Sequence, residues 1–438
     1  MIELCMDFYK KYAAFNERLM LGDKLFMDRS AKGCRVGGRQ TGDSRPVNFP
    51  RIGIYAGEGA SHSWLWFVDM FDRMGFHDLV FLDATAIQRE ALAGIDVLAV
   101  SGGDTFAVAK ALGPAGAGSL FKFISAGGMY IGSCAGAYLV MNSSKPGLND
   151  FNFSAVKITN LSKALPNCRL LPHKFAMSYG CDYIFHPVRE AVRLKTTVHS
   201  PCGVQGEFQA PLYGGPAMIA PDEAQVLATY EGFSPKTVFL VDEKFAYETL
   251  VGKAAALRSA LGKGCLYLCG PHFEHPRFPA ANAFLAEAIY WDNQYPAARQ
   301  QTADCDLPLS EAESRSLLKD IKREVSNARI SASSIELRPV RWLIGAKYYE
   351  PEKIMVFLQA LWRRLTYLEK RGFLKATAER SSLLRRYAKE TTALMRQLKQ
   401  QVDQACDTCG AAENLFGLLQ RFAITFLEMY FQTARTHI

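Results

Sequence analysis

The chain has 438 residues, of which 49% are hydrophobic and 21% are charged. This composition is typical of a globular protein and excludes a largely disordered chain, and the length predicts two domains. The net charge is +8, and most of the excess lies after residue 300. A solvated helical surface explains this charge better than an acidic partner such as a nucleic acid does.

The cysteines and the first residues indicate where the protein works. The 11 cysteines are irregularly spaced, which favours a reducing compartment over a disulfide framework. Cys406 and Cys409 form a single C-x-x-C pair, interpreted as incidental with a redox pair as the alternative, because a zinc site needs four ligands. No signal peptide and no run of about 18 uncharged apolar residues is found. We therefore expect a cytoplasmic protein with no membrane segment and no cofactor.

The predicted elements change character near residue 50. Before it, an apolar rhythm predicts a helix within residues 1–28, followed by a loop rich in Gly, Arg and Ser over 29–48. After it, short apolar strands alternate with helical patterns, which predicts a mostly parallel sheet with helices on both faces. The strands are expected at 52–56, 79–83, 95–100, 128–131, 236–241 and 264–270, and the helices at 62–74, 105–112, 119–126 and 135–141.

Residues 142–235 have a less regular pattern. Short strand-like runs predict an antiparallel extension of the sheet, with long loops that shape the wall of a pocket. Tyr213 and Glu207 are candidates for ligand contact in this region, with packing or solvent exposure as the alternative. The runs lie at 155–158, 196–199, 217–220 and 225–230.

The most informative stretch places Cys134 between Gly132 and Gly136, in the pattern G-x-C-x-G after a predicted strand. This is the spacing of a nucleophile elbow, in which a sharp, strained turn needs small residues two positions before and after the nucleophile. The turn is expected to hold the side chain clear of the sheet, where backbone N–H groups and the following helix favour a thiolate. The alternative is a buried structural cysteine.

Two glycine turns are expected at the same sheet edge as this elbow, because the carboxyl ends of parallel strands meet there. Gly102 and Gly103 follow one strand and would offer N–H groups to an oxyanion, with the N–H of Ala135 as the second donor. Gly57 and Glu58 belong to the turn after another strand and are candidates for substrate binding.

His272 supplies the base that a cysteine nucleophile needs. It follows the predicted strand at 264–270, and Glu274, two residues later, can orient its ring. A histidine in a loop is usually a surface residue, but this position, with a carboxylate nearby and an elbow upstream, is more specific. His275 is the rival imidazole and ranks lower.

These motifs resemble the class I glutamine amidotransferase-like superfamily and, within it, most resemble the N-terminal domain of eukaryotic-type biotin-protein ligases. The resemblance covers residues 50–292 and implies a flavodoxin-like fold, a triad of Cys134, His272 and Glu274, and an oxyanion hole at the glycine turn and the elbow. The matching segments are 55–61, 101–104, 132–136, 213–216, 262–264 and 270–274.

The chain also departs from these relatives. It contains no Gly-Arg-Gly-Arg type adenylate-binding loop, so biotinylation is not implied, and no fused synthetase that would use ammonia. The expected function is therefore an amidotransferase-like reaction on an amide or related acyl bond of a small-molecule or peptide-like substrate, through a thioester. Two alternatives remain: a non-catalytic binding or scaffold protein of the same fold, and a redox or glyoxalase-type protein.

The last third of the sequence predicts a helical bundle. A capping box at Ser310 opens the first helix, and Pro351 suits the first turn of the second. The two arginine pairs at 363–364 and 385–386 are interpreted as solvated faces, and docking to the rest of the chain, to a second copy or to a partner enzyme is the expected use of the bundle. The helices are expected at 310–328, from 351 to a break at Gly372, at 374–402 and at 413–434, and the domains at 1–48, 49–292 and 293–438.

Overall fold

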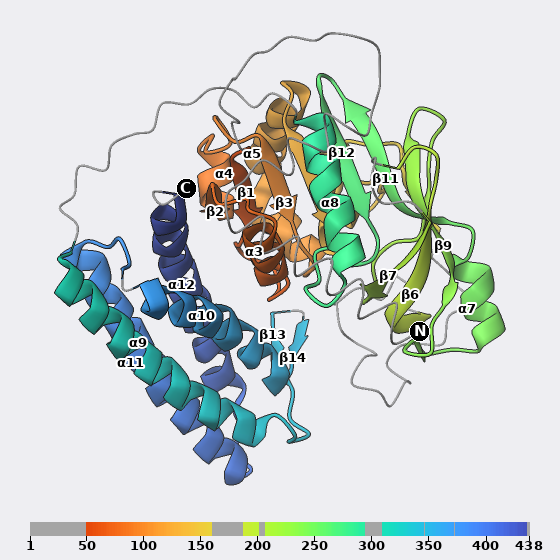
Figure 1. Cartoon of the computed structure of the whole chain (residues 1–438). Coiled ribbons are helices and arrows are strands. Elements are labelled where there is room, and N and C mark those ends of the chain that lie inside the picture. The colour runs from red at the N-terminus through yellow and green to blue at the C-terminus, as the bar shows by residue number, and fades with distance from the viewer. Residues whose placement is uncertain are drawn as a thin grey trace.

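The computed structural model describes residues 50–159, 187–200, 206–293, 309–345, 347–371 and 373–435. These residues form an α/β part built on one mixed sheet and, beside it, a group of long helices (Figure 1). The predicted helix within 1–28, the loop over 29–48 and most of the linker after 293 lie outside the described residues.

The half of the sheet that carries the candidate site is parallel. In spatial order, its strands are Gly264–Cys269 (β12), Met129–Ser133 (β4), Val97–Val100 (β3), Ile52–Tyr55 (β1) and Leu79–Leu82 (β2). Their residues are almost all buried because helices cover both faces, and this explains their continuous apolar sequences. The predicted parallel strands are confirmed at 52–56, 79–83, 95–100, 128–131 and 264–270. The strand expected at 236–241 is shortened to Val238–Phe239 and is antiparallel.

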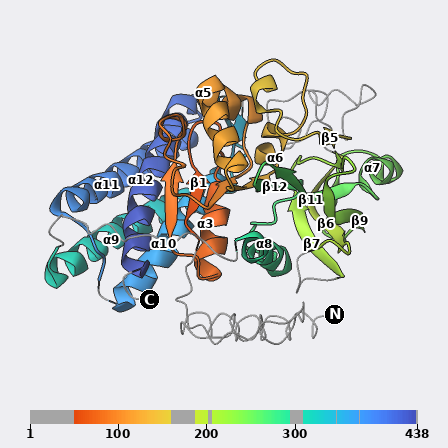
Figure 2. The same ribbon diagram turned by 90° about the horizontal axis from the view of Figure 1, so that it is seen from above.

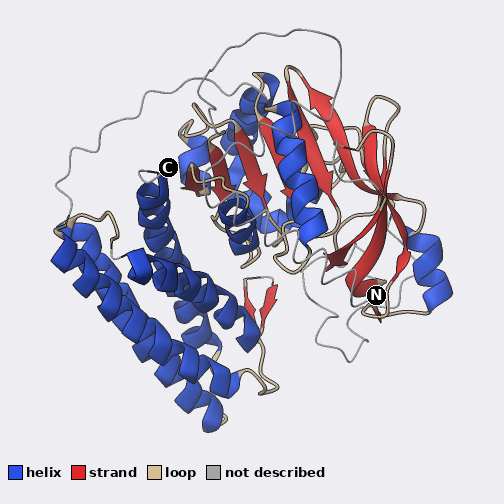
Figure 3. Cartoon of the chain, in the orientation of Figure 1, coloured by secondary structure: helices blue, strands red, loops and turns tan. Residues whose placement is uncertain are grey.

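The other half of the sheet is antiparallel and continues it beyond β12 (Figure 3). Its strands are Ala254–Leu261 (β11), Gln225–Phe233 (β9), Val188–Thr196 (β6), Val238–Phe239 (β10), Glu207–Leu212 (β7), Met218–Ile219 (β8) and Lys157–Ile158 (β5). The predicted antiparallel extension is confirmed, but its limits were partly wrong. Neither β7 nor β11 was expected, and the run predicted at 196–199 only touches the end of β6.

Helices cover the two faces of the sheet with separate apolar cores. The helices Trp64–Arg73 (α3) and Pro279–Asp292 (α8) share a core on one face, and Thr105–Ser125 (α5) and Ala135–Leu139 (α6) share another on the opposite face. Gly113, with φ 57°, and Pro114 break α5, so the two helices expected there form one kinked element. The remaining elements are Ala84–Gln88 (α4), Glu243–Leu250 (α7) and a short 3-10 turn at Asn149–Phe151.

The C-terminal part is helical, as expected. Its helices are Glu311–Ile335 (α9), Pro351–Arg371 (α10), Ala378–Asp403 (α11) and Cys409–Arg435 (α12), and a hairpin of Trp342–Ile344 (β13) and Lys347–Tyr349 (β14) precedes α10. The hairpin was not predicted. No helix within the described ranges is long and apolar enough to cross a membrane.

The C-terminal helices pack directly on the α/β part. Figure 2 shows α10 and α12 beside α3 and the β1 end of the sheet. Trp64 of α3 meets Phe357 of α10 edge to face at 6.3 Å, and Phe81 of β2 faces Phe431 of α12 at 6.5 Å. One apolar core therefore runs through both parts, and the domain boundary expected at 293 stays a prediction.

Arg364 corrects the interpretation of its arginine pair as a solvated face. Its side chain is 3% exposed and lies 2.9 Å from a carboxylate oxygen of both Asp69 and Asp72 on α3. Arg363 also pairs with Asp69 at 2.9 Å, although half of its side chain is exposed. The pair is a clamp between α10 and α3, because burial forces the Arg364 guanidinium to find carboxylate partners. Arg386, by contrast, is exposed, as expected.

Candidate active site

Cys134 lies in a strained turn between β4 and α6. Its backbone has φ 52° and ψ −106°, a conformation that residues other than glycine rarely adopt and that costs about 1–3 kcal/mol. The N–H of Cys134 donates to the carbonyl of Cys269 at 2.9 Å, which ties the turn to the end of β12. The α6 helix has only five residues, so its dipole stabilises negative charge at the Cys134 sulfur less than the longer helix expected from the sequence would.

The glycines on either side of Cys134 are sterically required. A Cβ on Gly132 would lie 2.5 Å from the carbonyl oxygen of Gly136, and a Cβ on Gly136 would lie 2.1 Å from that of Val100. Tyr130 donates its hydroxyl to the Gly136 carbonyl at 2.7 Å and fixes the turn from inside the core. The G-x-C-x-G spacing therefore has the physical cause that an elbow requires.

The loop after β12 brings His272 and Glu274 to this turn. Because β12 pairs with β4 in the register Cys269 to Ser133, the residues that follow the two strands leave the sheet side by side. Nδ1 of His272 lies 2.6 Å from Oε1 of Glu274, and both side chains are almost fully buried. The three residues expected to act together therefore come from two distant segments and meet at one sheet edge.

The electrostatics of His272 reflect these two neighbours. Burial by itself lowers the pKa of the imidazole, but the negative charge of Glu274 and hydrogen bonding with the Cys134 thiol outweigh it, so that the pKa is raised to about 9. Nε2 of the ring has no partner of strict hydrogen-bond geometry among the described residues. The ring is thus held as a cation beside the sulfur by one carboxylate.

Ser133 is a functional candidate that sequence reasoning missed. Its hydroxyl donates to Oε2 of Glu274 at 2.8 Å, in the buried interior. The Glu274 carboxylate therefore spans Ser133 and His272, and the residue next to Cys134 helps to orient the His272 ring through this carboxylate. No sequence signal separates this serine from any other variable position of an elbow.

The glycine turn after β3 lies against the same histidine. A Cβ on Gly102 would lie 2.5 Å from Cε1 of His272, so only glycine fits there. The register of β3 with β4 pairs Val100 with Gly132. Gly102 and Cys134, each two positions later, therefore leave the sheet at the same level. Within the part of the chain that the structure describes, no backbone carbonyl accepts from the N–H groups of Gly102, Gly103 or Ala135.

The turn with Gly57 and Glu58 supports Gly103. A Cβ on Gly103 would lie 2.0 Å from the carbonyl oxygen of Gly59, and Ala60 forms an isolated bridge with Gly103. The carbonyl of Glu58 accepts from the Tyr55 hydroxyl at 2.8 Å, but its side chain is exposed, and nothing places its carboxylate at the triad. This turn is thus a scaffold for the glycine turn that follows β3.

Aromatic rings surround His272. Tyr213 is half-buried with its ring centre 5.7 Å from the imidazole, while its hydroxyl donates to Glu190 at 3.1 Å. Trp66 of α3, which the sequence did not indicate, meets the His272 ring edge to face at 5.2 Å. Glu207, the other candidate of this region, is exposed and pairs with Arg193 at 3.4 Å.

His275 has a different role from His272. Burial, followed by the nearby charges of Arg277 and His272, lowers its pKa to about 2, so the ring is neutral. Its Nδ1 accepts from the N–H of Arg277 at 3.2 Å, and the ring packs on Trp66 at 4.4 Å. The rival imidazole is therefore part of the packing around the loop.

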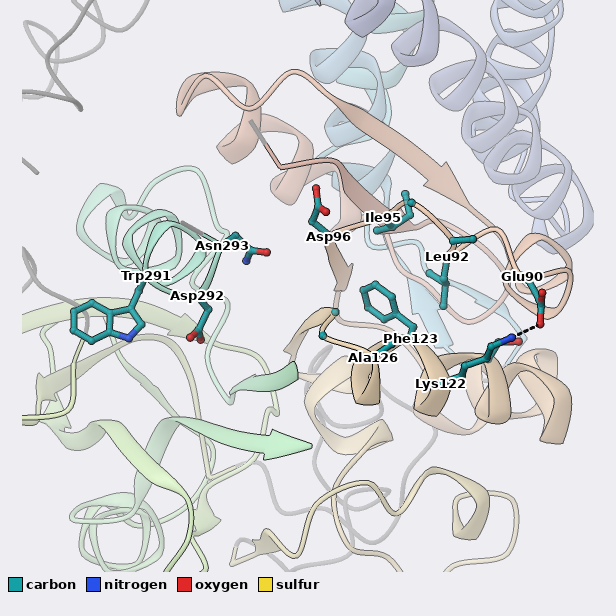
Figure 4. Close-up of a pocket in the computed structure, with 15 residues that line it drawn as sticks. Glu90, Leu92, Ile95, Asp96, Lys122, Phe123, Ala126, Trp291, Asp292 and Asn293 are labelled. Carbon is teal, nitrogen blue, oxygen red and sulfur yellow. Dashed lines mark hydrogen bonds and ion pairs between the residues drawn. The ribbon is translucent and has the colours of Figure 1, made fainter. Parts of the chain in front are cut away.

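One large cavity lies at the opposite edge of the sheet. It has a volume of about 880 Å³ and is bordered by Asp96 before β3, Phe123 of α5, and Asn293 after α8 (Figure 4). Cys134 itself is only 2% exposed. Neither Cys134 nor His272 lines this cavity, so it is separate from the candidate active site.

The structure also describes the C-x-x-C pair and the groups of side chains that could hold a metal ion. Cys406 and Cys409 are both free and exposed. Among the described residues, no group of three or more His, Cys, Asp and Glu side chains is arranged to hold a metal ion.

The raised pKa of His272 predicts a pH-dependent contribution to folding. A group that holds its proton more tightly in the folded chain stabilises the fold fully below its ordinary pKa of 6.5, and this contribution is lost as the pH rises through about 9. We expect His272→Asn to lower the free energy of unfolding by roughly 2–3 kcal/mol more at pH 6 than at pH 10, measured by urea denaturation. The exposed His199→Asn is the control, and an equal cost at both pH values would contradict the raised pKa.

The mixed sheet flanked by helices, the strained Cys134 turn and the loop after β12 define an α/β protein with a glycine-flanked cysteine turn at the carboxyl end of a parallel strand. The family model "Biotin-protein ligase, N terminal" matches residues 51–326, which is more than half of the chain, and the chain belongs to this family. No curated protein matches the chain.

Three solved structures are among those to which the chain is similar at low sequence identity. A putative GMP synthase subunit from Thermoplasma acidophilum is 13% identical, with 57% of this chain and 97% of that chain covered and a TM-score of 0.36. A glutamine amidotransferase from Thermotoga maritima is 10% identical, with 55% and 83% covered and a TM-score of 0.30. A beta-galactosidase from Bacillus circulans sp. alkalophilus is 12% identical over 57% of this chain, which spans only 32% of that longer chain, with a TM-score of 0.32.

Proposed function

We propose that the protein is a cysteine-nucleophile enzyme of the amidotransferase type, which acts on an amide or related acyl bond through a thioester. The observation that carries the proposal is the strained Cys134 turn beside the buried ion pair of His272 and Glu274. The cationic ring next to the sulfur favours a thiolate, and strain at a nucleophile is typical of functional sites.

In the proposed reaction, the proton of Cys134 already lies on the His272 ring, and the Cys134 thiolate attacks the acyl carbon. The N–H groups of Gly102, Gly103 and Ala135 hold the resulting oxyanion. As the tetrahedral intermediate collapses, the carbon–nitrogen bond breaks and the leaving amine takes the proton from His272. Water then attacks the thioester while the neutral His272 takes one of its protons, and the acid is released as the Cys134 thiolate leaves. The proton stays on His272, which restores the starting state.

The substrate is proposed to be a small molecule or a peptide-like amide, in a cytoplasmic setting. The family name refers to biotin-protein ligases, but the chain has no recognised adenylate-binding loop, so biotin transfer is not part of the proposal. If the substrate is glutamine, the C-terminal helices are proposed as the surface for an enzyme that uses the ammonia, or for a second copy.

A second function is a non-catalytic binding or scaffold role, and one observation favours it. Among the described residues, Cys134 and His272 are each only 2% exposed, which restricts the access of a substrate to the sulfur. In that case the elbow and its partners maintain the fold without a reaction.

Thiol labelling separates the two functions. The chloroketone analogue of glutamine, L-2-amino-4-oxo-5-chloropentanoate, should alkylate Cys134 at least about tenfold faster than the exposed Cys406 and Cys409, as followed by mass spectrometry of the peptides. His272→Asn should remove this preference, because the sulfur loses its cationic neighbour. Labelling of Cys134 no faster than that of the exposed thiols would support the scaffold role.

A further inference from the structure

The glycine turn after β3 is held by the turn after β1. The N–H of Asp104 donates to the carbonyl of Gly59 at 2.8 Å, and the N–H of Ser61 donates to the carbonyl of Gly102 at 3.0 Å. The Ser63 hydroxyl also donates to the Gly102 carbonyl, at 3.1 Å. These bonds hold the carbonyl of Gly102 in place. The N–H of the same peptide group belongs to Gly103 and donates to no backbone carbonyl among the described residues. The position of the candidate oxyanion donors therefore depends on where residues 57–61 lie.

A residue from the C-terminal helices fixes the start of that turn. Gln420 of α12 donates its side-chain amide to the carbonyl of Ala56, the last residue before Gly57. Ala56 is buried, so its carbonyl needs a protein donor. Tyr349, at the end of β14, packs on Phe416 of α12 at 4.6 Å. Burial is the main cause that raises the pKa of the Tyr349 hydroxyl, and the nearby carboxylate of Asp104 raises it further.

The helix after the turn is held by the same region. α3 begins directly after Ser63, presents Trp66 to His272, and carries Asp69, which pairs with Arg364 of α10. The C-terminal helices thus contact the chain before residues 57–63, at Ala56, and after them, at Asp69. The same segment is hydrogen-bonded to the glycine turn at Gly102 and Asp104.

We propose that Gln420 is a positioning residue for the candidate oxyanion hole, so that the C-terminal helices are part of the catalytic unit. The inference rests on the proposed function of Cys134. Loss of the amide leaves the buried Ala56 carbonyl without its donor and lets residues 57–61 shift. Gly103 touches Gly59, so this shift displaces the N–H groups at the glycine turn, where donors must lie within about 0.5 Å of their productive position.

The test compares two small reagents that react with the same sulfur. Chloroacetone carries a carbonyl that oxyanion donors can polarise, and the thiolate displaces its chloride. Methyl methanethiosulfonate carries no carbonyl, and the thiolate displaces methanesulfinate from its sulfur. The ratio of the two rates at Cys134, resolved by peptide mass spectrometry in the full chain, reports the oxyanion donors separately from the state of the thiol.

Gln420→Met keeps the side-chain volume and removes the donor, and the exposed neighbour Arg421→Ala on the same helix is the matched control. We expect Gln420→Met to slow chloroacetone about five- to tenfold while the thiosulfonate rate changes less than twofold. Gln420→Glu, which opposes the carbonyl with a carboxylate, should slow it at least as much, and Arg421→Ala should change neither rate.

Three outcomes are informative. A selective loss of chloroacetone reactivity supports the positioning role. Equal rates in wild type and Gln420→Met, or a parallel loss with both reagents, overturn it. If Cys134 in the wild-type protein reacts with neither reagent faster than Cys406 does, the proposed function fails first, and the two failures are thereby distinguished.

Discussion

Replacing Cys134 by alanine should abolish acyl transfer while the fold remains intact. Alanine keeps the Cβ and the φ of 52°, so the turn gains no strain and loses only the sulfur. Residues that act as one catalytic unit lose most of the rate when any of them is removed, so His272→Asn should lower turnover by about 10³-fold or more.

The measurement is ammonia release from L-glutamine and from a set of primary amides and small peptides, together with trapping of the thioester by hydroxylamine. Circular dichroism and the midpoint of thermal unfolding report the fold of each variant. His199→Asn, an exposed histidine far along the chain from the triad, should keep the wild-type rate. Undiminished turnover in Cys134→Ala would end the proposal.

Replacing Arg364 by methionine should cause the largest loss of stability among substitutions outside the site. Asp69 and Asp72 would stay in the interface between α3 and α10 without their shared cation. Although burial disfavours the charged form of Asp72, the Arg364 guanidinium keeps the pKa of that carboxyl below its usual value. Asp69 keeps its pairing with Arg363, so the loss arises mainly at Asp72. Removing one partner of a buried ion pair costs about 3–5 kcal/mol when the other charge is left uncompensated.

Urea denaturation at pH 7 measures this loss as a change in the free energy of unfolding. Arg386→Met is the matched control, because its side chain is 63% exposed and its pairing with Glu390 across one helical turn should contribute less than about 1 kcal/mol. A loss for Arg364→Met no larger than that of the control would mean that the clamp contributes little.

The sequence predicts the parallel half of the sheet well and parts of the antiparallel half poorly. Strands such as β4 are short, apolar and bounded by glycine, and burial on both faces leaves no other pattern. β11 reads Ala-Ala-Ala-Leu-Arg-Ser-Ala-Leu, which favours a helix locally, yet it pairs with β12 on one side and β9 on the other. Here hydrogen bonding to a neighbouring strand on each side overrides the local helical propensity.

The site divides in the same way. Cys134, His272 and the glycines were indicated by spacing, because a sharp turn and a close backbone approach restrict the residue type. Ser133 and Trp66 were not, because they meet Glu274 and His272 only across the folded sheet edge and carry no local pattern of their own. The burial of Arg364 could not be predicted either, since the carboxylates that surround it lie nearly 300 positions earlier in the chain.

The apolar core shared by the sheet and the C-terminal helices has a consequence for how this architecture can be inherited. A recombination event that carried away only the α/β segment would leave Trp64 and Phe81 without Phe357 and Phe431. We therefore expect the two segments to be inherited together. A relative that possesses only the first segment should bear polar side chains where this chain has Trp64 and Phe81.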